Sequence, residues 1–385
     1  MKKTTCIASL MVCLSMGQAG ALAQNIRIDM NKTYPEKTIS LQKVADVKYI
    51  PLETTDEVLF NGTVTNLSAE GIAGFNKKEG DILVFDGTGK AIASFNHTGQ
   101  GPNEYNKIYH LDVDWKQKEV YVQDNFRQKI RIYALNGSHL RTIDLQETMQ
   151  QGDLYNFSDT HLIYYAQPKS KPVTPYEPVT LLSKKDASKA TLPFTKTDDN
   201  LVKATGGPFG DMKMSAKNVN LLCKKGDEVY VNEVTADVIY RVESNHALTP
   251  VVDRTPSYQD ASGQDFFLML TGANARYYFF KRQQALLEFQ GNAATDTKST
   301  YVAYDRKEKQ LLNPTFTNED YPSQDIPMSK LLQCAGSANR CYLQLEAFKL
   351  KEALAGGKLK GELKAIAEKL DEEDNPVLMV VEFKK

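Results

Sequence analysis

Short apolar runs separated by turn residues dominate the chain from residue 47 onward, and their spacing is that of β-strands. The runs ILVF (82–85), AIASF (91–95), EVYV (119–122) and KIRIY (129–133) alternate with segments rich in glycine, asparagine and aspartate. Runs of roughly 4–8 residues rich in β-branched and aromatic side chains, bounded by such turns, predict β-strands. The pattern therefore indicates an all-β domain.

One strand-rich unit recurs along the chain. Four matches at an offset of 48 residues relate the segments on either side of residue 100, namely Phe85 with Tyr133, Gly89 with Gly137, Ile92 with Leu140 and Phe95 with Ile143. The run EVYV at 119–122 also returns unchanged at 228–231. A repeat of roughly 40–50 residues built from short strands is typical of the blades of a β-propeller.

Five successive units can be outlined, and the two chain ends supply a sixth. The five units span 64–95, 108–145, 153–195, 218–253 and 276–316, and the last contains the runs YYFF, ALLEF, TYVAYD and QLLNPTF. We expect the sixth to take inner strands from 341–345 and 377–383 and its outer strand from 47–52. Sharing a blade between both ends closes the ring and removes an open sheet edge. The prediction is a monomeric six-bladed β-propeller over 47–385.

Two segments depart from the strand pattern. Residues 24–46 are expected to form an extended leader, which can lie against the propeller. A helical insert is expected at about 346–371, where Leu359, Leu363, Ile366 and Leu370 are spaced by 4, 3 and 4 residues along one helical face.

The first 23 residues predict export. Two lysines precede an apolar stretch, and Ala21-Leu22-Ala23 forms a small-residue cleavage site, so we expect a signal peptide removed before Gln24. Lipid attachment at Cys13 is the alternative, although Val12 is large for the position before a modified cysteine.

The remaining chain is expected in the periplasm or outside the cell. It carries 45 basic and 48 acidic residues, a formal charge of −3, because residues 1–23 contain two of the 47 lysines and arginines and no acid. The sequence lacks the basic stripe that would indicate a nucleic-acid partner, and it lacks a second long apolar run that would indicate a membrane span.

A resemblance to a known family rests on four motifs in order. These are YIPLET (49–54), Phe85-Asp86 with Gly89-Lys90, GQGPNEY (99–105) and DNPVL (374–378). Together they resemble the six-bladed β-propeller family of secreted Bacteroidetes proteins, which is similar to NHL-type propellers in outline. The resemblance covers roughly residues 38–385. It implies neither agreed catalytic residues nor an established ligand.

The GQGPNEY segment has a structural interpretation and a binding one. Gly99 and Gly101 permit positive φ, Pro102 fixes the next turn, and Tyr105 can fill the groove between adjacent blades. A phosphate-binding loop would need a following helix, and a strand follows here. Contact with a ligand near the central channel is the alternative. Its candidate residues are His97, Gln100, Asn103, Glu104, Tyr105 and His110.

Asp112 and Asp114 are the candidate metal ligands. They alternate with apolar residues and therefore share one face of a predicted inner strand. Carboxylates facing a propeller channel can bind Ca²⁺, while solvation at a strand edge is the alternative. No other cofactor is predicted. Exposed aromatic side chains could also stack on sugar rings, with Tyr164, Tyr165, Tyr277 and Tyr278 as candidates, while packing within the strands explains most of them.

The cysteines and the remaining motifs offer little chemistry. Cys334 and Cys341 bracket a short polar loop and can form a disulfide in an oxidising compartment, or they remain two thiols. The five histidines are scattered, with no HExxH, and no GxSxG occurs.

A non-catalytic binding or interaction module for a glycan or a protein is therefore expected. A structural role in an envelope complex is a second possibility. The alternative from another class is a metal-assisted hydrolase or lyase acting on a glycan or lactone at the channel mouth.

Overall fold

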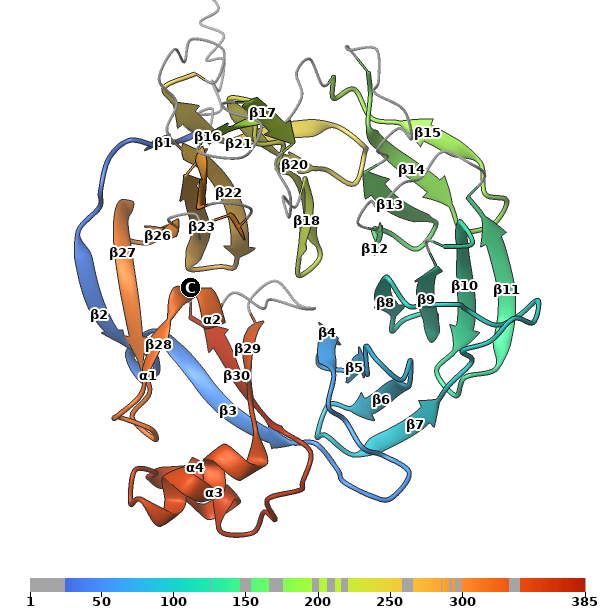
Figure 1. The fold of residues 1–385 in the computed structure, drawn as a ribbon, viewed down its shortest axis with the longest axis vertical. Helices are drawn as coiled ribbons and strands as arrows, with labels where there is room; N and C mark the ends of the chain where they lie inside the picture. Colours follow the sequence, from blue (N-terminus) through green and yellow to red (C-terminus); the bar gives the residue numbers. More distant parts are fainter. Residues whose placement is uncertain are drawn as a thin grey trace, which may run out of the picture.

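Six sheets, each built around antiparallel strands, are arranged around a central channel as the blades of a propeller (Figure 1). The structure is a computed structural model, and it describes residues 25–124, 126–145, 154–165, 176–195, 201–205, 212–215, 221–257, 266–284, 286–290, 293–294, 299–331 and 340–384. The predicted fold class is confirmed.

The first three blades follow the chain in order, each with its first strand innermost (Figure 1). Blade 1 contains β4 (Thr63–Leu67), β5 (Gly71–Phe75), β6 (Ile82–Asp86) and β7 (Ala91–Phe95). Blade 2 contains β8 (His110–Asp114), β9 (Glu119–Asp124), β10 (Lys129–Ala134) and β11 (His139–Asp144). Blade 3 contains β12 (Leu154–Asn156), β13 (His161–Tyr165), β14 (Val179–Ser183) and β15 (Lys189–Thr191).

The amino-terminal segment runs along the outside of the next two blades before it enters the sixth (Figure 1). Blade 4 contains β18 (Leu222–Lys225), β19 (Glu228–Val231), β20 (Val238–Val242) and β21 (Leu248–Thr255), and β1 (Ile26–Asp29) pairs in parallel with β21. Blade 5 contains β22 (Phe266–Ala273), β23 (Tyr277–Gln284), β26 (Ser299–Asp305) and β27 (Gln310–Thr317). Along β27 lie β2 (Glu36–Ser40), which is parallel, and β28 (Asp325–Pro327).

Blade 6 closes the ring with strands from both chain ends. It contains β29 (Arg340–Leu345), β30 (Val377–Phe383) and β3 (Ala45–Pro51), and Tyr49 lies opposite Met379. Short helices α1 (Leu41–Val44) and α2 (Met328–Leu331) precede β3 and follow β28. The predicted closure by an amino-terminal outer strand is confirmed.

The helical insert lies between β29 and β30. It consists of α3 (Ala347–Ala355) and α4 (Gly361–Ala367), separated by Gly356 and Gly357. Leu359, Leu363 and Leu370 are buried in one core cluster with α3 and β30. The predicted apolar face is therefore real, although Leu359 and Leu370 lie just outside the α4 helix itself.

One predicted strand belongs elsewhere. The run ALLEF does not lie in blade 5, because β24 (Leu286–Gln290) pairs in parallel with β16 (Leu201–Thr205) in a separate sheet that also holds β17 (Met212–Ser215) and β25 (Ala293–Ala294). The inner strand of blade 5 is β22, which precedes the predicted unit. An excursion between β23 and β26 thus interrupts the fifth repeat.

The sequence repeats correspond to equivalent structure. In blade 2 the hydroxyl of Tyr121 donates to Glu119 (2.5 Å), and in blade 4 that of Tyr230 donates to Glu228 (2.6 Å). An arginine binds each glutamate, Arg141 at 2.6 Å in blade 2 and Arg241 at 3.3 Å in blade 4. Identical EVYV runs therefore form the second strand of their blades with the same contacts.

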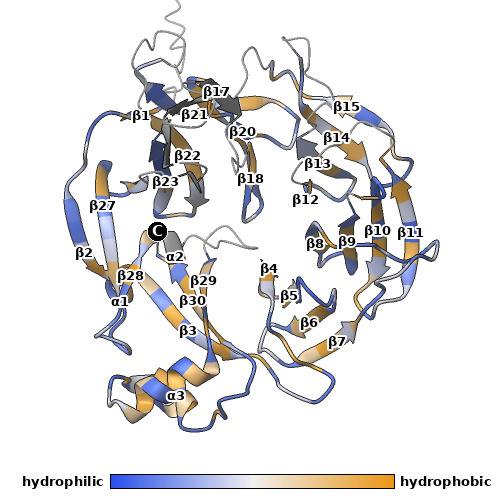
Figure 2. Ribbon diagram, viewed as in Figure 1, coloured by the Kyte–Doolittle hydropathy of each residue, from blue (hydrophilic) through white to orange (hydrophobic). Residues whose placement is uncertain are grey.

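Apolar side chains pack between neighbouring blades. One core cluster joins Ala73 and Val84 of blade 1 to Val120 and Tyr133 of blade 2. Figure 2 shows the hydrophobic segments along the strands and the hydrophilic ones largely in the connections. Among the described residues, no helix is long and apolar enough to cross a membrane.

Candidate functional site

The residues predicted to bind a ligand lie in two different places. His97 and the GQGPNEY loop (residues 99–105) precede the first residue of β8, whereas His110 lies on β8 itself. The His97 ring stacks on Tyr133 with centroids 5.0 Å apart, and the His110 ring lies edge-on to Tyr155 at 5.1 Å. The two histidines have different partners and do not form one site.

The polar groups of the GQGPNEY loop bind one another and Arg127. The Arg127 guanidinium donates to the carbonyls of Gly99, Gly101 and Glu104 and to Gln100 Oε1, at 2.7–3.2 Å. The Glu104 carboxylate accepts the N–H of Gly101 at 2.6 Å. These contacts support the structural interpretation of the loop.

Tyr105 anchors the same loop between blades 1 and 2. Its buried hydroxyl donates to the Gly80 carbonyl at 2.7 Å and accepts the His97 N–H at 3.0 Å. The side chain of Asn103 is exposed, and its main-chain carbonyl accepts the hydroxyl of Tyr133 at 2.6 Å. Ligand contact by His97, Gln100, Asn103, Glu104 and Tyr105 remains an untested prediction.

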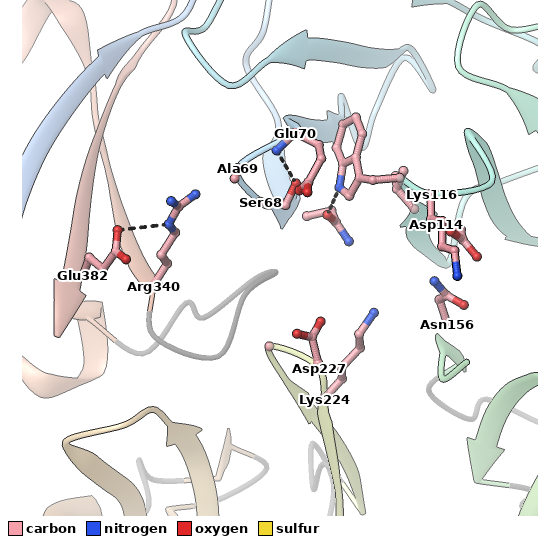
Figure 3. A pocket seen from close by; sticks show the side chains of 14 residues that line it. Ser68, Ala69, Glu70, Asp114, Lys116, Asn156, Lys224, Asp227, Arg340 and Glu382 are labelled. Atoms are coloured by element: carbon pink, nitrogen blue, oxygen red, sulfur yellow. Dashed lines mark hydrogen bonds and ion pairs between the residues drawn. The ribbon is translucent and has the colours of Figure 1, made fainter. Parts of the chain in front are cut away.

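A pocket of about 570 Å³ lies at the other end of β8, at one mouth of the central channel (Figure 3). We call it the channel-mouth pocket. Its lining comes from five blades. The lining residues are Asn66, Ser68, Ala69 and Glu70 of blade 1, Val113 to Lys116 of blade 2, Asn156 of blade 3, Lys224, Gly226 and Asp227 of blade 4, and Arg340 and Glu382 of blade 6. Tight turns between first and second strands bring many of these residues to the mouth.

Asp112 joins the inner strands of four blades below this pocket. Its carboxylate accepts the Asn66 amide at 2.7 Å, the Asn156 backbone N–H at 2.8 Å and the Lys224 ammonium at 2.9 Å. Burial would raise the pKa of Asp112, but Lys224, His110 and the hydrogen bond from the Asn156 N–H together lower it. Asp112 is therefore a carboxylate paired with a lysine.

Asp114 is paired in the same way. Its carboxylate lies 2.7 Å from the ammonium of Lys184, and both side chains are only 5% exposed. In the described part of the chain, no group of three or more His, Cys, Asp or Glu side chains could hold a metal ion. A lysine beside each aspartate opposes the binding of a cation, so Ca²⁺ at Asp112 and Asp114 stays a prediction without structural support.

Burial of His110 makes the stability of the fold depend on pH. Burial lowers the pKa of His110 from the ordinary 6.5, and Lys224 adds to the lowering while Asp112 opposes it. The unfolded chain therefore takes up a proton at His110 more readily than the folded chain does. The contribution of neutral His110 to the free energy of unfolding is fully present above pH 6.5 and is lost as the pH falls below it.

We expect the free energy of unfolding of the wild type to fall more than that of His110→Asn between pH 7.5 and 5.5. The extra loss should be about 1 kcal/mol, and urea titrations at both pH values measure it. Identical losses in the two proteins would contradict the assignment of a lowered pKa.

Two further predictions concern aromatic residues and cysteines. Tyr164, Tyr165, Tyr277 and Tyr278 are all buried in the described structure, which supports packing within the strands and not stacking on sugar rings. Cys341 is buried on β29, and Cys334 lies outside the described residues, so their disulfide stays a prediction.

The aromatic residue at the pocket is Trp115, which the sequence analysis did not single out. It directly follows the two aspartates of β8 and is the single tryptophan of the chain. Its indole N–H donates to Asn66 Oδ1 at 2.6 Å. The candidate ligands Asp112 and Asp114 indicated this place on the chain, but only the fold brings Asn66, Lys224, Asp227 and Arg340 to it.

Comparison with known proteins supports the propeller arrangement. The profile of a domain of unknown function, DUF4934, matches residues 25–382. No curated protein matches the chain.

Two solved structures have similar folds. One is a Bacteroides fragilis protein provisionally named as exported, with 15% identity, a TM-score of 0.62, and coverage of 94% of this chain and 100% of the other. The other is a DUF4221 family member from Bacteroides vulgatus, with 8% identity, a TM-score of 0.50, and coverage of 89% and 98%. At these identities the similarity concerns the fold alone.

Proposed function

We propose that the propeller of this chain, which belongs to the DUF4934 family, is an exported, non-catalytic binding module whose hydrophilic ligand enters the channel-mouth pocket. One observation carries the proposal. The pocket has the volume of a small-ligand site, and polar and charged side chains from five blades converge on it. Such a surface offers many hydrogen-bonding groups, which favours a polar ligand.

The proposed export rests on the amino-terminal pattern and on the provisional name of the similar Bacteroides fragilis protein. Residues 1–23 have the charged, apolar and small-residue segments of a signal peptide. Mass spectrometry of protein recovered from the periplasm or the medium of expressing cells should give a mature chain that begins at Gln24. A chain that retains residues 1–23 and stays in the cytoplasm would contradict this part of the proposal.

Binding is favoured over catalysis because most of the charged side chains that line the pocket are held in ion pairs. Lys224 binds Asp112, Lys184 binds Asp114, and Arg340 binds Glu382 at 3.3 Å. A general acid or base needs a pKa suited to proton transfer and reach to a substrate atom. Carboxylates held against lysines are poor candidates for that role and for metal-assisted hydrolysis.

A binding assay followed by product analysis tests this proposal. A compound that changes Trp115 fluorescence should be recovered intact after prolonged incubation with equimolar protein, with or without added Ca²⁺ or Zn²⁺. Mass spectrometry reads the outcome. Turnover of the compound into fragments would support the alternative, a metal-assisted hydrolase or lyase.

A further inference from the structure

We propose that the channel-mouth pocket binds a neutral saccharide and that Trp115 is the ring against which the sugar packs. The inference rests on the proposed binding function and names its ligand class. An indole offers a flat apolar face, and the C–H face of a pyranose is its natural partner. Trp115 is partly exposed at the pocket, whereas the other aromatic candidates are buried.

The orientation of Trp115 is fixed by Asn66. The indole N–H can only donate and the carboxylate of Asp112 can only accept, so the Asn66 amide has one arrangement that satisfies both. Its Oδ1 accepts from Trp115 at 2.6 Å, and its Nδ2 donates to Asp112 at 2.7 Å. Asn66 and Asp112 are each 4% exposed, which makes this a rigid support.

Gly71 leaves room for the same ring. A Cβ atom at this position would lie 2.5–2.6 Å from two ring carbons of Trp115, closer than real contacts allow. The six-membered ring therefore packs directly over the backbone of β5, with its N–H already bound. The polar atom of the indole is satisfied inside the protein, which leaves apolar ring surface for a ligand.

Hydrogen-bond donors and acceptors line the same pocket as the ring. Glu70 and Asp227 come from turns of blades 1 and 4 and have no ion pair among the described residues. Hydrogen bonds from the Ser68 hydroxyl and from the backbone N–H of Glu70 hold the pKa of the Glu70 side chain below its usual range. Glu70 is therefore a carboxylate that can accept a hydrogen bond from a sugar hydroxyl. Lys116, Arg340 and Asn156 supply donors (Figure 3).

The charge balance selects against anionic sugars. Of the described residues, the lining contains the acids Glu70, Asp114, Asp227 and Glu382 and three cations, so its formal charge is 3 − 4 = −1. A simple cation would leave the donors of the lining unused, whereas hydroxyl groups both donate and accept. A neutral saccharide therefore fits the lining better than an acidic sugar or a basic peptide does.

Trp115 reports binding because it is the single tryptophan. The probes are neutral trisaccharides of glucose, galactose, mannose and N-acetylglucosamine, together with trigalacturonic acid, which differs from galactotriose only in the oxidation of its C6 carbons, and trilysine. At least one neutral trisaccharide should shift the emission and protect Trp115 from acrylamide. Trigalacturonic acid and trilysine should bind at least tenfold more weakly.

The role of Asn66 is tested with a matched pair of variants. In Asn66→Ala the affinity should fall about five- to tenfold, the emission maximum should move to longer wavelength, and acrylamide should quench more strongly. Asn61→Ala is the control, because its side chain is exposed and the residue lies outside the pocket lining. That variant should match the wild type in all three measurements.

The outcomes separate this inference from the proposed function. Tighter binding of trigalacturonic acid or trilysine than of every neutral sugar would overturn the saccharide assignment and leave a binding module. A response to none of the probes would overturn both. Unchanged emission and quenching in Asn66→Ala would show that Asn66 does not position the ring.

Discussion

Replacement of Arg131 by methionine is expected to lower the free energy of unfolding by about 3–5 kcal/mol, the usual cost of removing one partner of a buried ion pair. Arg131 on β10 lies 3.1 Å from the Asp124 carboxylate, and the two side chains are 1% and 0% exposed. Without the guanidinium, the Asp124 charge stays buried, where the backbone N–H groups of Asn106 and Arg127 still donate to it. Urea unfolding followed by circular dichroism measures the loss.

Two further variants isolate the buried charge as the cause. Lys129→Met changes the same strand at an exposed pair, where Lys129 and Asp144 are 3.7 Å apart, and should cost less than about 1 kcal/mol. Adding Asp124→Asn to Arg131→Met should restore most of the loss, because an amide is cheaper to bury than a carboxylate. No recovery in the double variant would mean that lost packing, not lost charge, destabilises the protein.

Lys48→Pro should open the ring at blade 6 and lower the free energy of unfolding by about 2 kcal/mol or more. The ladder between β3 and β30 is flanked by bonds from Leu52 N to Pro376 O (3.2 Å) and from Lys384 N to Val44 O (2.9 Å). In an antiparallel pair, every second residue of a strand bonds to the partner strand. Val44 and Leu52 both bond to the partner strand, and Lys48 lies four residues from each. Its N–H therefore points at Val380, the residue opposite it on β30.

The matched control is Lys48→Ala, which keeps the N–H. The Lys48 side chain is exposed, so its removal should change stability by less than about 0.5 kcal/mol. Thermal and urea unfolding compare the two variants. Equal stability of Lys48→Pro and Lys48→Ala would show that this ladder does not hold the ring closed.

Repeated local chemistry made most of the blades predictable. Gly89 and Gly137 occupy the same turn of blades 1 and 2 with φ of +91° and +85°, values that favour glycine. The offset between them therefore reports a shared backbone shape, not only a shared composition. The closing blade was predictable for a related reason, since a short strand near each end of the chain needed a partner.

The strands of blade 5 could not all be assigned from the hydrophobic pattern. ALLEF has the same apolar character as a blade strand, and nothing within the run shows that its neighbour is β16, more than 80 positions earlier in the chain. The parallel pairing of the leader strands with β21 and β27 was equally hidden. Hydrophobic periodicity identifies strands, but it does not choose their partners.

The candidate site was predictable only in part. Asp112 and Asp114 were expected on one face of an inner strand, and they are, but the lysines beside them come from blades 3 and 4. Such partners lie 70 and 112 residues away in sequence, so spacing alone suggested a metal. The GQGPNEY loop is recognisable as a sequence motif because its backbone shape requires those residues. Arg127 stabilises that shape by binding the loop carbonyls.

Hydrogen–deuterium exchange with the tightest-binding saccharide tests most directly whether the channel mouth is the binding site. Binding there predicts slower exchange at residues 66–71, 113–116 and 224–227, with no change at 97–105. Protection confined to 97–105, around the GQGPNEY loop, would contradict this account and place the ligand at the opposite end of β8.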